Sequence, residues 1–339
     1  MGSNTWSSTI SKYATELSIV SIVAIFFVGL VFPKGLNWLF VMGFMICFIA
    51  FIGLSRTGRL SGIFINERNL MSLSRFQLVI WTIIVLSAFL TIALVRVSAS
   101  VADPDGITDP LAIALPEQLW TLLGISTVSL VGSPLILSTK LPKEPTPQEE
   151  EAFIAKKVAK FDKENAKIIA ANFMGTKGKE ITDIKFAEKI FENTTMEAKL
   201  KTLAKGETGK EVKAKMLALE KKQKETVARV KRIGADAERN GTLNFNEDIK
   251  DASFSDLFKG DEKGNCDYID MAKVQMFFFT LIIAFSYMVL LVNLIMTKDA
   301  TELNSFPELS DGLVALLGIS AAGYLANKPG DKTKTVPKP

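Results

Sequence analysis

The chain contains no histidine and only two cysteines among its 339 residues. Without histidine, the protein has no imidazole general base, no His-ligated metal site and no haem held by a histidine. Cys47 lies in an apolar run and Cys266 in a polar segment, so we expect no disulfide between them, and two thiolates cannot complete a four-ligand metal site. There is also no Gly-rich phosphate loop and no Gly-x-Ser-x-Gly motif. These absences predict a protein that is not an enzyme and that holds no metal or cofactor.

The charge of the chain is concentrated in one region. Charged residues make up 22% of the sequence, yet the mean hydropathy is +0.25. Residues 140–270 hold 27 of the 40 basic and 25 of the 36 acidic residues, so the remainder is strongly apolar. This segregation indicates a membrane protein that carries a charged insert.

Six apolar segments have about the length that crosses a bilayer as a helix. They are residues 17–32, 36–54, 76–95, 119–138, 276–296 and 313–326. The first two are separated by Pro33-Lys34-Gly35 and should form a hairpin. The sixth is short and needs 307–312 for its first turns, unless it is re-entrant or buried among neighbours. The predicted fold is an all-α integral membrane protein with six transmembrane helices and a helical, coiled-coil-like cytoplasmic insert.

The loop charges predict the orientation. The 55–75 loop and the end of the chain are basic, whereas the 97–117 loop contains four carboxylates and no lysine or arginine. By the positive-inside rule, both termini and the insert are cytoplasmic, and we expect the membrane to be the bacterial cytoplasmic membrane. The predicted organisation is a cytoplasmic N-terminus (1–16), a transmembrane hairpin (17–54), a basic loop (55–75), a first repeat (76–138) with an external loop (97–117), the insert (139–270), a second repeat (271–326) and a basic cytoplasmic tail (327–339).

Two blocks of sequence occur twice and predict two parallel two-helix repeats. The first block reads basic-x-Gln-x-x-x-aromatic-Thr, and the second reads Leu-Leu-Gly-Ile-Ser. The repeated positions are Arg75 and Lys273, Gln77 and Gln275, Thr82 and Thr280, Gly124 and Gly318, and Ser126 and Ser320. The insert lies between the two repeats.

The repeated residues suggest roles in packing or conduction. Arg75 and Lys273 are expected to anchor their helices at the inner interface. Gln77 and Gln275 should bond across helices or line a polar conduit, because an amide inside a membrane needs partners. The small residues of the fourth and sixth segments predict close packing of inner helices, which leaves the third and fifth segments facing lipid. No ionisable residue lies at the centre of a predicted span, which argues against an ion-coupled transporter.

The insert is predicted to be helical, with segments from Pro147 to Phe173, from 194 to 206 and from 208 to 234. Apolar residues in the last segment follow 4-3 spacing, typical of a coiled-coil seam. The seam contains Val212, Met216, Leu219, Val230 and Ile233. It either packs within the insert or docks a cytoplasmic protein through residues 146–234. The balanced charge of the insert argues against nucleic acid as a partner.

These features favour a non-enzymatic membrane scaffold or anchor, embedded in the lipid bilayer and forming a homo-oligomer. The alternative is an oligomeric ion channel or pore lined by Gln, Ser and Thr of the duplicated helices. A transporter is the third hypothesis.

Overall fold

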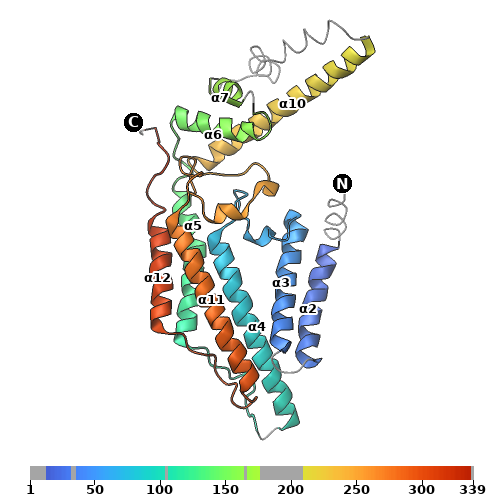
Figure 1. The fold of residues 1–339 in the computed structure, drawn as a ribbon, viewed down its shortest axis with the longest axis vertical. Coiled ribbons are helices and arrows are strands. Elements are labelled where there is room, and N and C mark those ends of the chain that lie inside the picture. The colour runs from blue at the N-terminus through green and yellow to red at the C-terminus, as the bar shows by residue number, and fades with distance from the viewer. Residues whose placement is uncertain (1–12, 32–35, 104–105, 164–165, 176–208, 337–339) are drawn as a thin grey trace. The chain divides into compact units, whose positions relative to one another are not determined.

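The computed structural model describes residues 13–31, 36–103, 106–163, 166–175 and 209–336 (Figure 1). Over these ranges the protein is all-helical, with isolated β-bridges but no strand. The α-helices are α2 (Ala14–Val31), α3 (Leu36–Thr57), α4 (Leu73–Ala102), α5 (Glu117–Ser138), α6 (Pro147–Ala159), α7 (Ala166–Met174), α10 (Gly209–Asn240), α11 (Met271–Thr297) and α12 (Asp311–Ala326). Short 3₁₀ turns are η1 (Gly62–Phe64), η2 (Ile249–Asp251) and η3 (Phe254–Leu257). The predicted helix at 194–206 lies outside the described residues.

The chain divides into two compact units. Unit 1 comprises Met1–Leu137, Asp248–Lys259 and Ile269–Gly330, and unit 2 comprises Ser138–Glu247, Gly260–Tyr268 and Asp331–Pro339. Residues 248–259, assigned above to the insert, therefore group with the apolar helices, and the segment from 331 groups with the insert.

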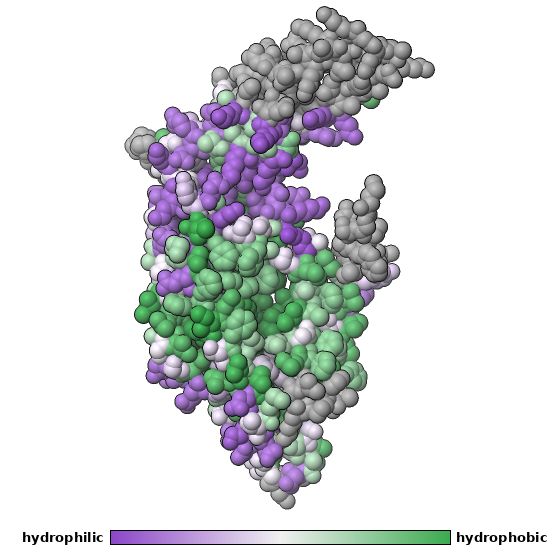
Figure 2. All heavy atoms as spheres, viewed as in Figure 1, coloured by the Kyte–Doolittle hydropathy of each residue, from purple (hydrophilic) through white to green (hydrophobic). Residues whose placement is uncertain are grey.

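Four helices of unit 1 are long and apolar enough to cross a membrane. They are Asn37–Thr57, Leu73–Ala102, Glu117–Ser138 and Met271–Thr297, and the shorter apolar helices are Ala14–Val28 and Asp311–Ala326. Figure 2 shows apolar residues covering much of the visible surface of unit 1. Large apolar side chains such as Phe26, Phe278 and Ile319 are exposed there. A hydrophobic exterior of this kind is compatible with an integral membrane protein.

Helices α4 and α11 form the centre of unit 1. Trp81 of α4 and Tyr287 of α11 are fully buried, with ring centres 6.3 Å apart. Across an 18-residue apolar stretch of each helix, 44% of the residues are buried in α4, against 33% in α11 and 28% in α5. The third segment, which was expected to face lipid, is therefore the most buried of the four long apolar helices within the chain. Large apolar side chains fill this core, and composition does not distinguish them from side chains that face lipid.

Although helix α12 is short, it ends at the level at which α11 begins. Before α12, the non-helical segment containing Leu303, Phe306 and Leu309 buries these three side chains in the core. At the other end, the Asn327 side chain donates to the Asp270 carboxylate at 3.3 Å, where Asp270 is the N-cap of α11. The extended segment and α12 together thus return along the 27-residue helix α11.

Unit 2 has its own apolar core, formed by α6, α7 and the C-terminal half of α10. The buried side chains include Phe153, Ile154, Ile169, Val230 and Ile233. The single helix predicted from 147 to 173 is wrong, because α6 ends at Ala159 and α7 begins at Ala166. The break lets both short helices turn their apolar sides toward α10.

Candidate functional site

The interior of unit 1 contains a hydroxyl cluster that joins three helices. The Tyr324 hydroxyl of α12 lies 3.2 Å from the Ser74 hydroxyl of α4 and 3.2 Å from the Ser133 hydroxyl of α5. All three residues are buried. Helix α4 starts at this cluster while α5 and α12 end near it, so α4 is antiparallel to the other two helices.

One helical turn further into the bundle lies a second set of polar side chains, which we call the polar layer: Gln77, Ser129 and Ser320. Gln77 is three residues after Ser74, Ser129 is four before Ser133, and Ser320 is four before Tyr324. Steps of three or four residues stay on one helix face and advance about 4.5–6 Å. Because α4 is antiparallel to α5 and α12, all three steps lead in the same direction from the hydroxyl cluster. The polar layer is therefore a shared level of the interior.

The polar layer is buried and its side chains lack partners. Gln77 and Ser129 are fully shielded and Ser320 nearly so. Among the described residues, neither amide atom of Gln77 nor the hydroxyl of Ser129 or Ser320 has a hydrogen-bond partner. Buried polar atoms in folded proteins nearly always have a partner, because leaving one unpaired costs about 1–3 kcal/mol. An unpaired cluster of this kind is a candidate binding site for something that hydrogen-bonds.

The repeated polar residues do not occupy equivalent positions. Gln77 is buried, whereas Gln275 is exposed on α11. Thr280 is buried and donates to its own helix at the Met276 carbonyl, 2.8 Å away, whereas Thr82 is only partly buried. The two copies of the sequence motif thus bring different polar residues into the interior, Gln77 in α4 and Thr280 in α11.

The Leu-Leu-Gly-Ile-Ser blocks also differ in their surroundings. The Ser126 hydroxyl donates to the Leu122 carbonyl at 3.1 Å, while Ser320 belongs to the polar layer. A methyl group built on Gly318 would meet Ile125 at 3.5 Å, an ordinary contact. Gly124 is exposed, and a methyl group built there would meet no atom within 4 Å.

Arg75 and Lys273 hold matching turns. Arg75 donates to the Ile65 carbonyl and pairs with Glu67, and Lys273 donates to the Lys259 carbonyl at 2.6 Å. In each case the accepting residue forms an antiparallel bridge with the residue four positions before the basic one, Ile65 with Met71 and Lys259 with Ile269. The basic side chains therefore fix the entry of α4 and α11 through backbone carbonyls.

Two further arginines organise loops in unit 1, and the sequence analysis did not single them out. Arg59 donates to the carbonyls of Ile249, Lys250 and Ala252 at 2.7–3.1 Å. Arg96 is buried near the end of α4 and donates to four carbonyls, of which that of Asp109 is the nearest at 2.8 Å. The sequence signal that could have identified Arg96 is its position directly after an apolar segment.

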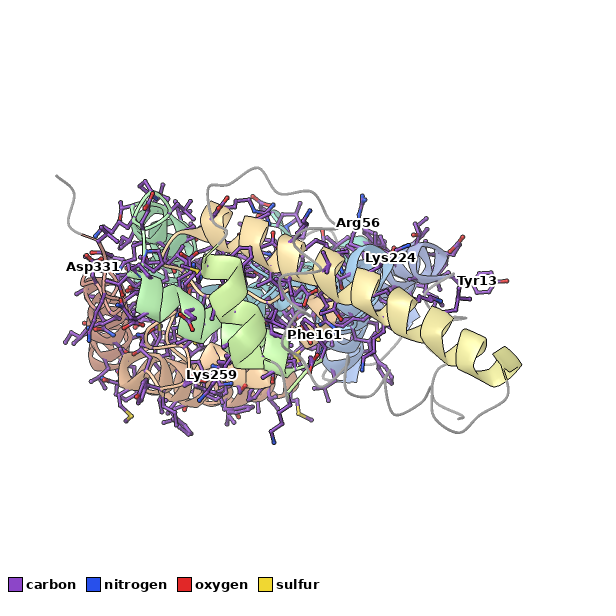
Figure 3. The ribbon with its side chains drawn as sticks, turned by 90° about the horizontal axis from the view of Figure 1, so that it is seen from above. Tyr13, Arg56, Phe161, Lys224, Lys259 and Asp331 are labelled. Carbon is purple, nitrogen blue, oxygen red and sulfur yellow. The ribbon has the colours of Figure 1, made fainter. Side chains whose placement is uncertain are left out.

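The residues of the predicted coiled-coil seam lie in two separate parts of α10. Val230 and Ile233 are buried in the core of unit 2, where the Arg229 guanidinium also lies 4.2 Å from the centre of the Phe161 ring, labelled in Figure 3. The side chains of Val212, Met216 and Leu219 lie outside the described part of the structure. Leu217 in the same half of α10 is 68% exposed, and Lys224, labelled in Figure 3, is exposed as well.

A buried ion pair in unit 2 holds the segment 331–336, which we call the tail strap. The Lys140 ammonium lies 2.6 Å from Glu262 Oε1, and Glu262 Oε2 accepts the backbone N–H groups of Lys332 and Thr333 at 2.9 Å each. Asp331 pairs with Lys143 at 2.6 Å, and this hydrogen bond holds the pKa of the Asp331 carboxyl below its usual value.

No protein-family model, curated protein or solved structure matches this chain. Within the described residues, no group of three or more Cys, Asp or Glu side chains is arranged to hold a metal ion.

Proposed function

We propose that the protein is a non-enzymatic membrane scaffold or anchor, in which unit 1 sits in the bilayer as an oligomer and unit 2 docks a partner protein through α10. The observation that carries this proposal is the division of α10 between two environments. The helix has 32 residues and is about 48 Å long. Among its described side chains, Val227, Val230, Ile233 and Ala237 pack in the core of unit 2, whereas Leu217 is 68% exposed. The preceding turns carry the seam positions 212, 216 and 219, which suit a helical partner.

Site-specific photo-crosslinking tests this proposal in the full chain. A photoreactive amino acid is placed at each position from 209 to 225 in turn, in cells that express the protein. Docking along the seam predicts crosslinks that recur with the 4-3 spacing of 212, 216 and 219 and are weak at Lys224, the matched exposed control. Crosslinks to a second copy of this chain would assign the seam to the homo-oligomer. Equal yields at all positions, or none, would contradict docking.

We also propose the finer topology of six spans with both termini cytoplasmic in the bacterial inner membrane, built on two repeats. The matching turns before α4 and α11 and the return of α12 to the start of α11 support it. A reporter fused within the 97–117 loop should be external, and one fused after Lys140 should be cytoplasmic. The opposite result at either position would refute this orientation.

A channel is the second candidate, and the polar layer favours it, because uncharged polar side chains can line a conduit. Purified protein in planar bilayers should then conduct ions, and Gln77→Leu should change the conductance while Gln275→Leu should not. Absence of any conductance in a correctly folded sample would leave the scaffold proposal.

A further inference from the structure

We propose that Gln77, Ser129 and Ser320 bind water in an enclosed site inside unit 1, closed on one side by Tyr324. This inference does not depend on whether the chain conducts ions or docks a partner. It rests on the unpaired atoms of the polar layer and on their position one turn from the hydroxyl cluster.

The donor and acceptor inventory fits water. The Gln77 amide offers two N–H donors and one carbonyl acceptor, and each serine hydroxyl both donates and accepts. A buried water makes about three hydrogen bonds to such groups and satisfies them at little cost. No Asp, Glu, Lys or Arg belongs to the layer, so the chemistry favours a neutral ligand over an ion.

Both sides of the layer are closed by packed side chains. On the side of the helix ends, the Tyr324 hydroxyl bridges Ser74 and Ser133. On the opposite side, Trp81, Leu122 and Leu317 belong to the hydrophobic core and are fully buried. Trp81 lies four residues beyond Gln77, and its indole N–H is also buried without a partner in the described structure. This N–H is a donor that could extend the water cluster further into the bundle.

Thermal stability of the purified protein distinguishes a hydrated layer from a dry one. If water hydrogen-bonds the Gln77 amide, the leucine of Gln77→Leu removes those hydrogen bonds and leaves the water with unpaired donors and acceptors. Gln77→Leu should then lower Tm by about 3 °C or more. If the amide is unsatisfied, the same substitution removes a buried unpaired group and Tm should rise or stay unchanged, which would overturn the proposal. Gln275→Leu is the matched control, since Gln275 is exposed, and should shift Tm by less than about 1 °C.

A second measurement applies even if Gln77→Leu does not fold. X-ray radiolysis of the wild-type protein generates hydroxyl radicals from bound water in place, so Tyr324 and Trp81, which border the layer, should be oxidised although both are buried. Radicals generated chemically in bulk solvent should leave the same two residues unmodified. If Tyr324 and Trp81 are as unmodified after radiolysis as after exposure to radicals from bulk solvent, bound water is refuted. Ser129→Ala combined with Ser320→Ala should reduce the radiolytic yield at Tyr324, and an unchanged yield would also count against the site.

Discussion

Substitution of Glu262 should release the tail strap from unit 2. The carboxylate contacts Lys140 through one oxygen and two backbone N–H groups of the tail strap through the other. The side chains of Lys140 and Glu262 are 0% and 4% exposed. Glu262→Gln keeps the shape but replaces one acceptor with an N–H₂ donor, which must then face either the ammonium or the two backbone donors.

The magnitude follows from the burial of the pair. Removing one member of a buried ion pair costs about 3–5 kcal/mol, because the other charge remains buried. Asp331 lies 3.5 Å from the Lys140 ammonium and offsets part of this cost, so we expect the lower end, about 3 kcal/mol. Since about 1.4 kcal/mol corresponds to a tenfold change in an equilibrium constant, the tail strap should open about 100-fold more often.

Hydrogen exchange measured by mass spectrometry is the suitable assay, because the four tryptophans, Trp6, Trp38, Trp81 and Trp120, all belong to unit 1 and do not report on unit 2. Peptides that contain Lys332 and Thr333 should lose about 100-fold of their protection in Glu262→Gln. Lys143→Met, which removes the half-exposed partner of Asp331, should lower protection less than about fivefold, as is usual for surface pairs. The double variant Lys140→Met with Glu262→Gln should be better protected than Glu262→Gln alone, because the buried charge of Lys140 is removed together with that of Glu262. Protection within threefold of wild type in the single variant would refute the reasoning.

Three further changes test other parts of the structure. Arg96→Met should destabilise unit 1 by about 2–4 kcal/mol, seen as a lower Tm by tryptophan fluorescence, because the carbonyls of Asp109, Pro110 and Leu303 lose their shared donor; a shift equal to that of an exposed-residue control would contradict this role. Gly241→Ala should destabilise unit 2 by about 2–4 kcal/mol, seen as faster hydrogen exchange across it, since Gly241 has φ +54° and a methyl group would lie 2.2 Å from the Leu141 carbonyl oxygen; exchange like that of wild type would show that the backbone adjusts. The lowered pKa of Asp331 means that this carboxylate contributes fully to the stability of unit 2 above the ordinary value near pH 4, and that the contribution is lost as pH falls through the lowered value. Pepsin cleavage in the tail strap should therefore increase below about pH 4 in the wild type and at a higher pH in Lys143→Met. Identical pH profiles of cleavage in the two proteins would contradict this prediction.

Sequence reasoning identified Gln77 because an amide in an apolar run needs a partner wherever the helix packs. It did not identify Tyr324, although this residue joins three helices. A tyrosine in an apolar run resembles any other large side chain, and its partners Ser74 and Ser133 are 250 and 191 residues away in the chain. Which faces of α4, α5 and α12 meet depends on tertiary packing, which local periodicity does not encode.

The composition of unit 2 was equally difficult to predict. The charged insert was recognisable from its lysine and glutamate content, but the tail strap that joins it was not. Glu262 and Thr333 are 71 residues apart, and the Glu262 carboxylate accepts the backbone N–H groups of Lys332 and Thr333 while it pairs with the buried Lys140 ammonium, contacts that no apolar pattern indicates. Arg96 was not predicted as a site residue because it directly follows the apolar segment 76–95, whereas α4 continues to Ala102.

The two copies of the basic-x-Gln-x-x-x-aromatic-Thr motif bury different polar residues, because the Gln and the Thr of the motif cannot both lie on one helix face. The Gln and Thr of the motif are five residues apart, which separates them by about 140° around a helix of 3.6 residues per turn. Helix α4 turns Gln77 inward. Helix α3 also packs against α4, where the Trp38 indole donates to the Ser87 hydroxyl at 2.9 Å. Helix α11 turns Thr280 inward and leaves Gln275 exposed. Gln275 therefore has no place in a buried layer like that of Gln77 in the described part of the chain, so substitutions at Gln77 and Gln275 should differ in effect even though the sequence motif treats them alike.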